Sequence, residues 1–138
     1  MVTDLGITVV PLYINVGQQS FLDGVDMSRQ EFYEKLPYFD HHPQTASPGP
    51  EMFRETYERL AAEGADEVLS IHISASLSGT LNTAQLGAEA TEIVPVTVLD
   101  SRQLSIGTGF LVEAAAKAAA AGRSLAEIIE SLREMGRR

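Results

Sequence analysis

The sequence predicts an α/β fold in which a mostly parallel sheet is flanked by helices. Runs of β-branched and aliphatic residues alternate along the chain with segments of helical periodicity. This alternation favours parallel strands joined by right-handed crossovers. A chain of 138 residues is long enough for one domain with a buried core. We therefore expect residues 1–138 to form a single α/β domain.

Three segments have the composition of strands, namely residues 7–16, 67–73 and 94–99. The first is rich in β-branched residues but contains Pro11, which has no amide proton for a sheet ladder. We therefore expect this strand to be bulged or to lie at an edge. Residues 40–50 contain three prolines and are expected to form a loop.

Five segments have helical patterns, namely residues 28–36, 50–63, 80–90, 105–121 and 124–135. Ser28 and Glu31 are three residues apart, as are Ser124 and Glu127, and a hydroxyl and a carboxylate at this spacing can form a capping box. Pro50 suits a first helical position, because the amide proton that it lacks would have no partner there. These signals predict helix starts near residues 28, 50 and 124.

The composition excludes several functional classes. Ten Lys and Arg against 19 Asp and Glu give a net charge of -9, which disfavours nucleic acid as a partner. The sequence has no cysteine, which excludes a disulfide framework, a cysteine nucleophile and a thiolate metal site. No apolar run approaches the roughly 20 residues of a membrane-spanning helix. Because the chain begins without a basic and then apolar signal segment, we expect a cytoplasmic location.

Two clusters of small hydroxyl residues precede predicted helices. Thr45–Gly49 ends a loop, and Ser74–Thr80 connects a predicted strand to a predicted helix. In open α/β sheets, ligands bind beyond the carboxyl ends of the strands, and hydroxyls and free amides at a helix start attract an anion. The alternative interpretation is that these residues only cap helices and fill tight turns.

Other signals for catalysis or for cofactor binding are weak. Residues 76–79 lack the first glycine of a G-x-S-x-G nucleophile elbow, and residues 107–109 do not follow a strand as a dinucleotide fingerprint requires. Residues 40–42, Asp-His-His, lie in a polar loop that is more typical of solvated side chains than of a metal site. His72 is expected to be a hydrogen-bonded side chain of a strand, either in the core or half-buried. We therefore predict no catalytic residue, no metal and no cofactor.

Several short motifs occur in a specific order. An Ile-Thr-Val-Val-Pro-Leu run at residues 7–12 is followed by an Asp-Gly turn, by the loop that contains Thr45, by Leu-Ser-Gly-Thr at 77–80 and by Asp-Ser-Arg at 100–102. The order and spacing of this set resemble the DegV family of fatty-acid-binding proteins. The resemblance extends from Leu5 to the end of the chain.

The resemblance implies a bacterial, cytosolic carrier of a long-chain, palmitate-like fatty acid rather than an enzyme. The tail would lie in the core of this domain and the carboxylate at the Ser/Thr loops, where a separate fatty acid kinase would receive the acid. By their positions in the family motifs, the implied ligand-binding residues are Thr45, Ser47, Ser74, Ser78, Gly79 and Thr80. Ala46, Gly49 and Ala75 stand where the family often has hydroxyl residues.

Two alternatives to a carrier remain open. One is a small-molecule transferase or hydrolase that uses the same loops, and the other is a structural domain without a ligand. The family also normally has a further strand and helix before residue 5 and a second domain after the first. We therefore expect this chain to be a fragment of a two-domain protein.

Overall fold

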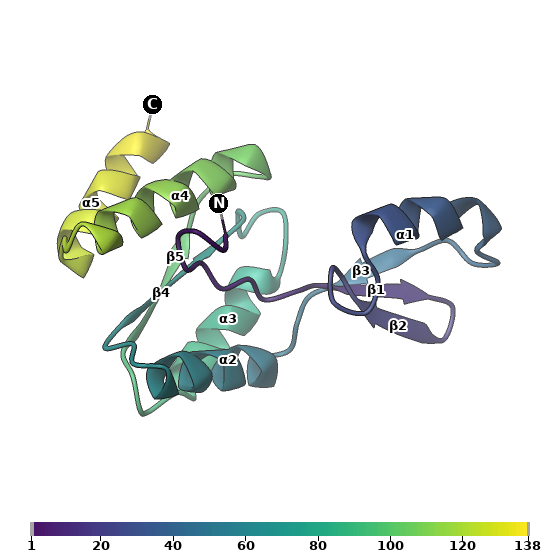
Figure 1. Ribbon diagram of the computed structural model, residues 1–138, viewed down its shortest axis with the longest axis horizontal. Helices are drawn as coiled ribbons and strands as arrows, with labels where there is room; N and C mark the ends of the chain where they lie inside the picture. The colour runs from purple at the N-terminus through teal and green to yellow at the C-terminus, as the bar shows by residue number, and fades with distance from the viewer. Residues whose placement is uncertain (1, 138) are drawn as a thin grey trace. The chain divides into compact units, whose positions relative to one another are not determined.

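The computed structural model describes residues 2–137, which form the helices and strands of an α/β protein (Figure 1). The predicted α/β class is confirmed. The described residues divide into two compact units, each with its own sheet. Unit 1 contains residues 2–9 and 49–137, and unit 2 is Val10–Pro48.

Unit 2 is a three-stranded antiparallel sheet with one α-helix and a short 3-10 helix. Its elements are β1 (Tyr13–Val16), β2 (Gln19–Leu22), α1 (Arg29–Lys35), η1 (Leu36–Tyr38) and β3 (Gln44–Ala46). β1 lies between the other two strands, so that Ile14 is opposite both Phe21 and Thr45. Ile14 and Val16 are buried and form part of the core of this unit.

The first strand differs from its prediction. It begins at Tyr13 instead of at residue 7, and it is central instead of at an edge. Pro11 has no amide proton and restricts the residue before it, so that the regular ladder starts only beyond it. Residues 44–46, predicted as loop, form β3 because their backbone pairs with β1. Composition does not reveal a pairing between segments so far apart in the sequence.

Unit 1 contains a parallel pair of strands and four helices. The strands are β4 (Val68–His72) and β5 (Val96–Asp100), and the helices are α2 (Pro50–Ala62), α3 (Thr80–Glu89), α4 (Ile106–Ala120) and α5 (Leu125–Gly136). The strand register runs from Val68 opposite Val96 to His72 opposite Asp100. The predicted helices and the parallel pairing are confirmed, with boundaries shifted by one or two residues.

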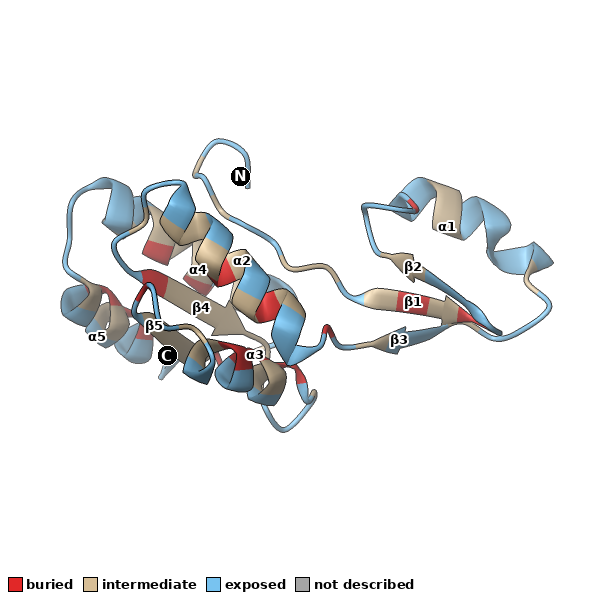
Figure 2. Ribbon diagram, turned by 90° about the horizontal axis from the view of Figure 1, so that it is seen from below, coloured by how far each residue is buried: buried red, intermediate tan, exposed pale blue. Residues whose placement is uncertain are grey.

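The helices of unit 1 cover both faces of the parallel pair (Figure 1). On one face, Leu69, Ile71 and Leu99 pack against a buried cluster from α4 and α5 (Leu111, Ala115, Ile128, Leu132). On the other face, Ser70 and His72 contact Tyr57 and Phe53 of α2. Figure 2 shows that buried and exposed positions alternate along these helices, as expected when one side of a helix faces a sheet.

Helix boundaries follow the capping signals in the sequence. At the start of α1, the Ser28 Oγ accepts the Glu31 amide at 3.1 Å. At the start of α5, the Ser124 Oγ accepts the Glu127 amide at 3.3 Å, and the Glu127 carboxylate accepts the Ser124 amide at 2.8 Å. This reciprocal pair is the predicted capping box. None of the helices within residues 2–137 is long and apolar enough to cross a membrane.

Candidate functional site

The loops that follow β4 and β5 meet at one edge of the parallel sheet. We call residues 73–79 loop A and residues 101–105 loop B. The Ser74 amide donates to the Gln103 carbonyl at 3.0 Å, and the Ala75 amide donates to the Asp100 carboxylate at 3.3 Å. Since ligands of α/β sheets bind at the carboxyl ends of the strands, loops A and B form the candidate site.

Two hydrogen-bonded pairs of hydroxyls lie in loop A and at the first residue of α3. The Ser74 and Ser76 hydroxyl oxygens are 2.8 Å apart, and so are those of Ser78 and Thr80. The bond within a pair uses one hydroxyl proton, so the Ser74–Ser76 pair retains a second proton for another acceptor. The Ser78 Oγ also accepts the Thr80 amide at 3.2 Å. When the Thr80 hydroxyl donates to Ser78, the Ser78 proton is directed to a further acceptor.

The start of α3 adds backbone donors to these hydroxyls. Gly79 is the N-cap, and within the described part of the chain no side chain makes a cap hydrogen bond there. The same is true of α4, which has Ser105 as its N-cap. By contrast, serine side chains cap α1 and α5. The amides of the first turn of a helix carry partial positive charge and suit an anion, and in α3 the first of them, from Thr80, already donates to the Ser78 Oγ.

The structure brings four of the six predicted ligand-binding residues together. Ser74, Ser78 and Gly79 lie in loop A, and Thr80 is the first residue of α3. Ser74 and Ser78 are half-buried, Gly79 is exposed and Thr80 is buried. Their proximity follows from the sequence motif, and their contact with a ligand stays a prediction.

Loop B has an unusual backbone. Arg102 and Ser105 have positive φ angles, 56° and 52°, a region that residues other than glycine rarely adopt. Strain of this kind persists only where surrounding contacts hold the chain, and it is common in binding sites. One such contact joins the hydroxyls of Ser101 and Thr108, 3.0 Å apart, and another joins the Arg102 amide to Asp100 at 2.8 Å. The sequence pattern did not reveal this role of Asp100.

A partly buried chain of polar groups leads from α2 toward loop A. The Tyr57 hydroxyl is 2.7 Å from the Ser70 Oγ, which is 2.7 Å from the His72 Nε2. The His72 ring also packs edge-on against Phe53, with ring centres 5.4 Å apart. Burial lowers the pKa of His72 and raises the pKa of Tyr57, so that both side chains are neutral near pH 7. The prediction that His72 is a hydrogen-bonded side chain is confirmed, and the side chain is half-buried.

Exposed aliphatic and aromatic side chains accompany the polar groups of the site. Leu77 of loop A is 59% exposed, Leu104 of loop B is 58% exposed, and Ile106 in the first turn of α4 is 72% exposed. Phe110 follows one turn later on the same side of α4 and is also exposed. The site therefore offers both hydrogen-bond donors and apolar surface.

The other two predicted residues, Thr45 and Ser47, lie in unit 2. Thr45 is an exposed residue of β3, and Ser47 is an exposed residue just beyond this strand. Thr45 lines a cavity of about 230 Å³ with Leu12, Phe32 and Tyr33 among its neighbours. Their role in ligand binding stays a prediction.

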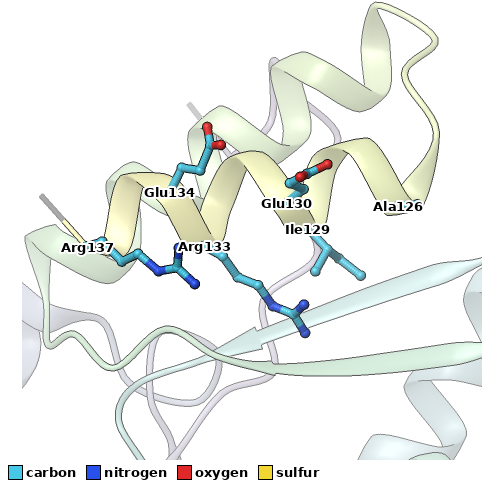
Figure 3. A pocket seen from close by; sticks show the side chains of 6 residues that line it. All are labelled: Ala126, Ile129, Glu130, Arg133, Glu134 and Arg137. Atoms are coloured by element: carbon cyan, nitrogen blue, oxygen red, sulfur yellow. The ribbon is translucent and has the colours of Figure 1, made fainter.

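Other parts of the chain have less suitable chemistry. Within residues 2–137 there is no group of three acidic or histidine side chains that could hold a metal. Asp40, His41 and His42 therefore do not form such a group. A groove of about 520 Å³ runs along α5 (Figure 3). Its lining is mostly charged, with Arg133 and Arg137 on one side of the helix and Glu134 on the other, which does not suit an acyl tail.

Comparisons with known proteins identify the family. The family model described as "Uncharacterised protein, DegV family" matches residues 1–138. A DegV domain-containing protein from Deinococcus radiodurans is 40% identical over 128 residues, which are 93% of this chain and 45% of that protein. This chain thus spans about half the length of the curated relatives that it matches.

Solved structures are similar over nearly the whole chain. A DegV family protein from Thermus thermophilus, reported for its fatty acid binding, is 36% identical with a TM-score of 0.85. The match covers 99% of this chain and 48% of the Thermus chain. DegV of Bacillus subtilis, described as a fatty acid binding protein, is 27% identical with a TM-score of 0.91, covering 99% of this chain and 49% of its own. The Fatty Acid Kinase (Fak) B3 protein of Streptococcus pneumoniae, loaded with linoleic acid, is 25% identical with a TM-score of 0.75 over 94% of this chain and 46% of its own. The chain belongs to the DegV family.

Proposed function

We propose that this chain binds a long-chain fatty acid, with the carboxylate at loop A and the tail in the apolar interior of the chain. The observation that supports this most strongly is the combination of the Ser74–Ser76 and Ser78–Thr80 hydroxyl pairs with the start of α3, where they lie beside the backbone amides of the first turn. Solved DegV proteins from Thermus thermophilus and Bacillus subtilis are described by their fatty acid binding, which supports the same ligand class here.

The chemistry of loop A fits a carboxylate. Hydrogen bonds to a charged group contribute about 1.5 to 3 kcal/mol each, and the helix start adds favourable partial charge. A cationic side chain is not required for such a site. The hydroxyls would therefore set the direction of the ligand, and they would do so without a metal or cofactor.

The acyl tail would supply most of the affinity. Burial of about a dozen methylenes at roughly 0.8 kcal/mol each gives on the order of 10 kcal/mol of gross driving force. Association and ordering oppose this with an estimated 4 to 15 kcal/mol. Net affinity therefore depends on a preformed apolar path and on satisfied hydrogen bonds at the headgroup.

Mass spectrometry after organic extraction tests the proposal directly. The full chain, purified from a bacterial host, should release about one equivalent of a C16 or C18 acid, or should take up one equivalent of palmitate on incubation. Circular dichroism of the same sample would establish that the protein is folded. A folded protein that neither contains nor takes up a fatty acid would contradict the proposed function.

We also propose that the bound acid is presented to a fatty acid kinase in the cytoplasm, where ATP is present. The Streptococcus pneumoniae relative named for fatty acid kinase supports this partner. The chain is loaded with radiolabelled palmitate and mixed with purified kinase and ATP. This mixture should yield an acyl phosphate. A complete kinase reaction with a full-length DegV protein as carrier is the positive control. Absence of product from this loaded chain, with product in the control, would exclude the kinase role for the chain.

Thr45 and Ser47 need a separate test, because they lie in unit 2. If their hydroxyls contact the headgroup, Thr45→Ala and Ser47→Ala should each weaken palmitate binding. Thr45→Val is the sharper test of Thr45, since it removes the hydroxyl and keeps the shape of the side chain and its preference for a strand. Equal palmitate affinity in wild type and Thr45→Val would exclude the Thr45 hydroxyl as a ligand contact.

A further inference from the structure

We propose that Asp100 is a positioning residue for the headgroup site, whose carboxylate fixes loop A against loop B and so orients the hydroxyls of loop A. The inference rests on the proposed function, because it concerns the affinity of the same site for a fatty-acid carboxylate. Asp100 itself is not assigned to contact the ligand.

The two oxygens of Asp100 serve the two loops separately. Oδ2 accepts the Ala75 amide of loop A at 3.3 Å, and Oδ1 accepts the Arg102 amide of loop B at 2.8 Å. A carboxylate offers two equivalent charged acceptors, which no neutral side chain of this size provides. Asp100 is the last residue of β5, so the sheet holds it in place.

The contact with Ala75 controls the direction of neighbouring hydroxyls. Ala75 lies between Ser74 and Ser76, whose hydroxyls are hydrogen-bonded at 2.8 Å. The Ser76 amide also donates to the Ser74 Oγ at 3.3 Å. Since the Ala75 amide is anchored at the centre of this group, loss of the anchor would let both hydroxyls rotate away together.

The contact between Asp100 and the Arg102 amide holds the strained backbone of loop B. Arg102 has a φ of 56°, and a left-handed residue other than glycine needs compensating contacts. Its amide is bound to Asp100, and the next amide, of Gln103, donates to the Ser101 Oγ at 3.1 Å. The Gln103 carbonyl in turn accepts the Ser74 amide. Loops A and B are therefore joined at two places, by the Ser74–Gln103 backbone bond and by the Asp100 carboxylate, which accepts one amide from each loop.

Because Asp100 is negatively charged, the direction in which Asp100→Asn changes palmitate affinity tests the inference. A negative charge beside a site for an anion weakens binding by simple repulsion. If charge were its only influence, Asp100→Asn would bind palmitate more tightly than the wild type. The positioning role predicts the reverse, because asparagine cannot supply two acceptors and would present an amide donor to the Ala75 or Arg102 amide.

Calorimetric titration of the full chain with palmitate and with hexadecanol separates the possible roles. The two lipids share a tail and differ in headgroup charge. Asp100→Asn should bind palmitate about tenfold more weakly, the equivalent of one hydrogen bond to a charged group, and should lose clearly less affinity for hexadecanol, whose neutral oxygen accepts weaker hydrogen bonds. Asp66→Asn is the control for loss of one negative charge, since exposed Asp66 precedes the opposite end of β4. It should leave palmitate binding unchanged or slightly stronger.

Several outcomes would overturn the inference. Unchanged or tighter palmitate binding by Asp100→Asn would show that the anchor does not matter, and an equal loss for both lipids would indicate general damage to the fold. A second variant, Asp100→Glu, retains the charge and displaces the oxygens, and it should also weaken palmitate binding more than hexadecanol binding. It replaces Asp100→Asn if that variant does not fold. A wild-type chain that binds neither lipid would contradict the proposed function and this inference with it, whereas a wild type that binds both lipids isolates the role of Asp100.

Discussion

Ser78 has two functions in loop A that a single substitution can separate. Its Oγ accepts the Thr80 amide and pairs with the Thr80 hydroxyl, and its proton is the proposed donor to the ligand. Ser78→Ala should cost about 1 kcal/mol of stability, by loss of its hydrogen bond to the first amide of α3. It should also weaken palmitate binding about tenfold, by loss of one hydrogen bond to a charged group. Calorimetry and urea unfolding measure the two effects.

Ser124→Ala is the matched control for Ser78→Ala. Ser124 caps α5 in the same unit by the same kind of contact, with the Glu127 amide at 3.3 Å. Its loss should reduce stability by a similar amount and leave palmitate affinity unchanged. Equal affinities for Ser78→Ala and the wild type would remove Ser78 from the proposed site.

His72 makes stability depend on pH. Burial lowers the pKa of His72 below its ordinary value of 6.5, so the unfolded chain binds a proton at a higher pH than the folded chain does. Stability is therefore highest above pH 6.5 and falls as the pH drops from 6.5 toward the folded pKa. His72→Gln, which retains a group able to contact Ser70, should remove this part of the pH dependence. Urea unfolding of both proteins at about pH 7.5 and 5.5 would measure it, and a slope that persists in His72→Gln would assign it to other groups.

At the scale of single residues, the sequence predicted the members of loop A better than their contacts. Ser74, Ser78, Gly79 and Thr80 are adjacent in the sequence, so the motif alone places them together. Asp100 lies far from Ala75 in the sequence, and only the parallel pairing of β4 with β5 brings its carboxylate to loop A. The positive φ of Ser105 has no signal in its residue type either, because serine does not favour positive φ.

The packing of α2 against α3 depends on a glycine. A Cβ added to Gly87 would lie 2.6 Å from the Phe53 Cβ and 2.8 Å from the Pro50 carbonyl oxygen, both too close. Gly87→Ala should force the helices apart and destabilise the protein by about 1 to 3 kcal/mol, as overpacking does. Thermal or urea unfolding would show this loss.

Gly109 of α4 provides the matched control for Gly87. A Cβ there would meet no atom within 4 Å, so Gly109→Ala should gain up to about 1 kcal/mol from better helix propensity. The two substitutions make the same chemical change within helices and should have opposite signs. A stabilising Gly87→Ala would show that α2 and α3 can separate without cost.

At the scale of elements, helices were predicted well and the antiparallel strands were not. Capping residues such as Ser28 and Ser124 act on their own next turn, so their signal is local. β3 is only three residues long and exists because it pairs with β1. Short strands depend on distant partners, and composition near the prolines of residues 40–50 indicated a loop.

If the chain binds a fatty-acid anion as proposed, its net charge opposes the ligand at long range and the hydrogen bonds of loop A attract it at short range. The net charge of -9 disfavours approach of a fatty-acid anion, but such repulsion is screened beyond about 8 to 10 Å at moderate salt. Hydrogen bonds from loop A act only within contact distance. We therefore expect palmitate to associate faster at higher ionic strength, because salt screens the long-range repulsion. The dissociation rate should change little, because it depends on the short-range hydrogen bonds. The rates follow from stopped-flow fluorescence with a labelled acid.

Ligand binding should also raise the stability of the folded chain. An acid that binds the folded state alone adds RT ln(1 + [L]/Kd), or about 2.7 kcal/mol at a free concentration 100 times the Kd. The thermal midpoint should therefore rise continuously with palmitate concentration below the point at which micelles form. Ser78→Ala should show a smaller rise at each concentration, because its Kd is larger, while Ser124→Ala should rise as much as the wild type from a lower starting midpoint. A midpoint that does not move while extraction recovers bound acid would mean that the acid binds the unfolded chain equally well, and loop A would then not be a specific site.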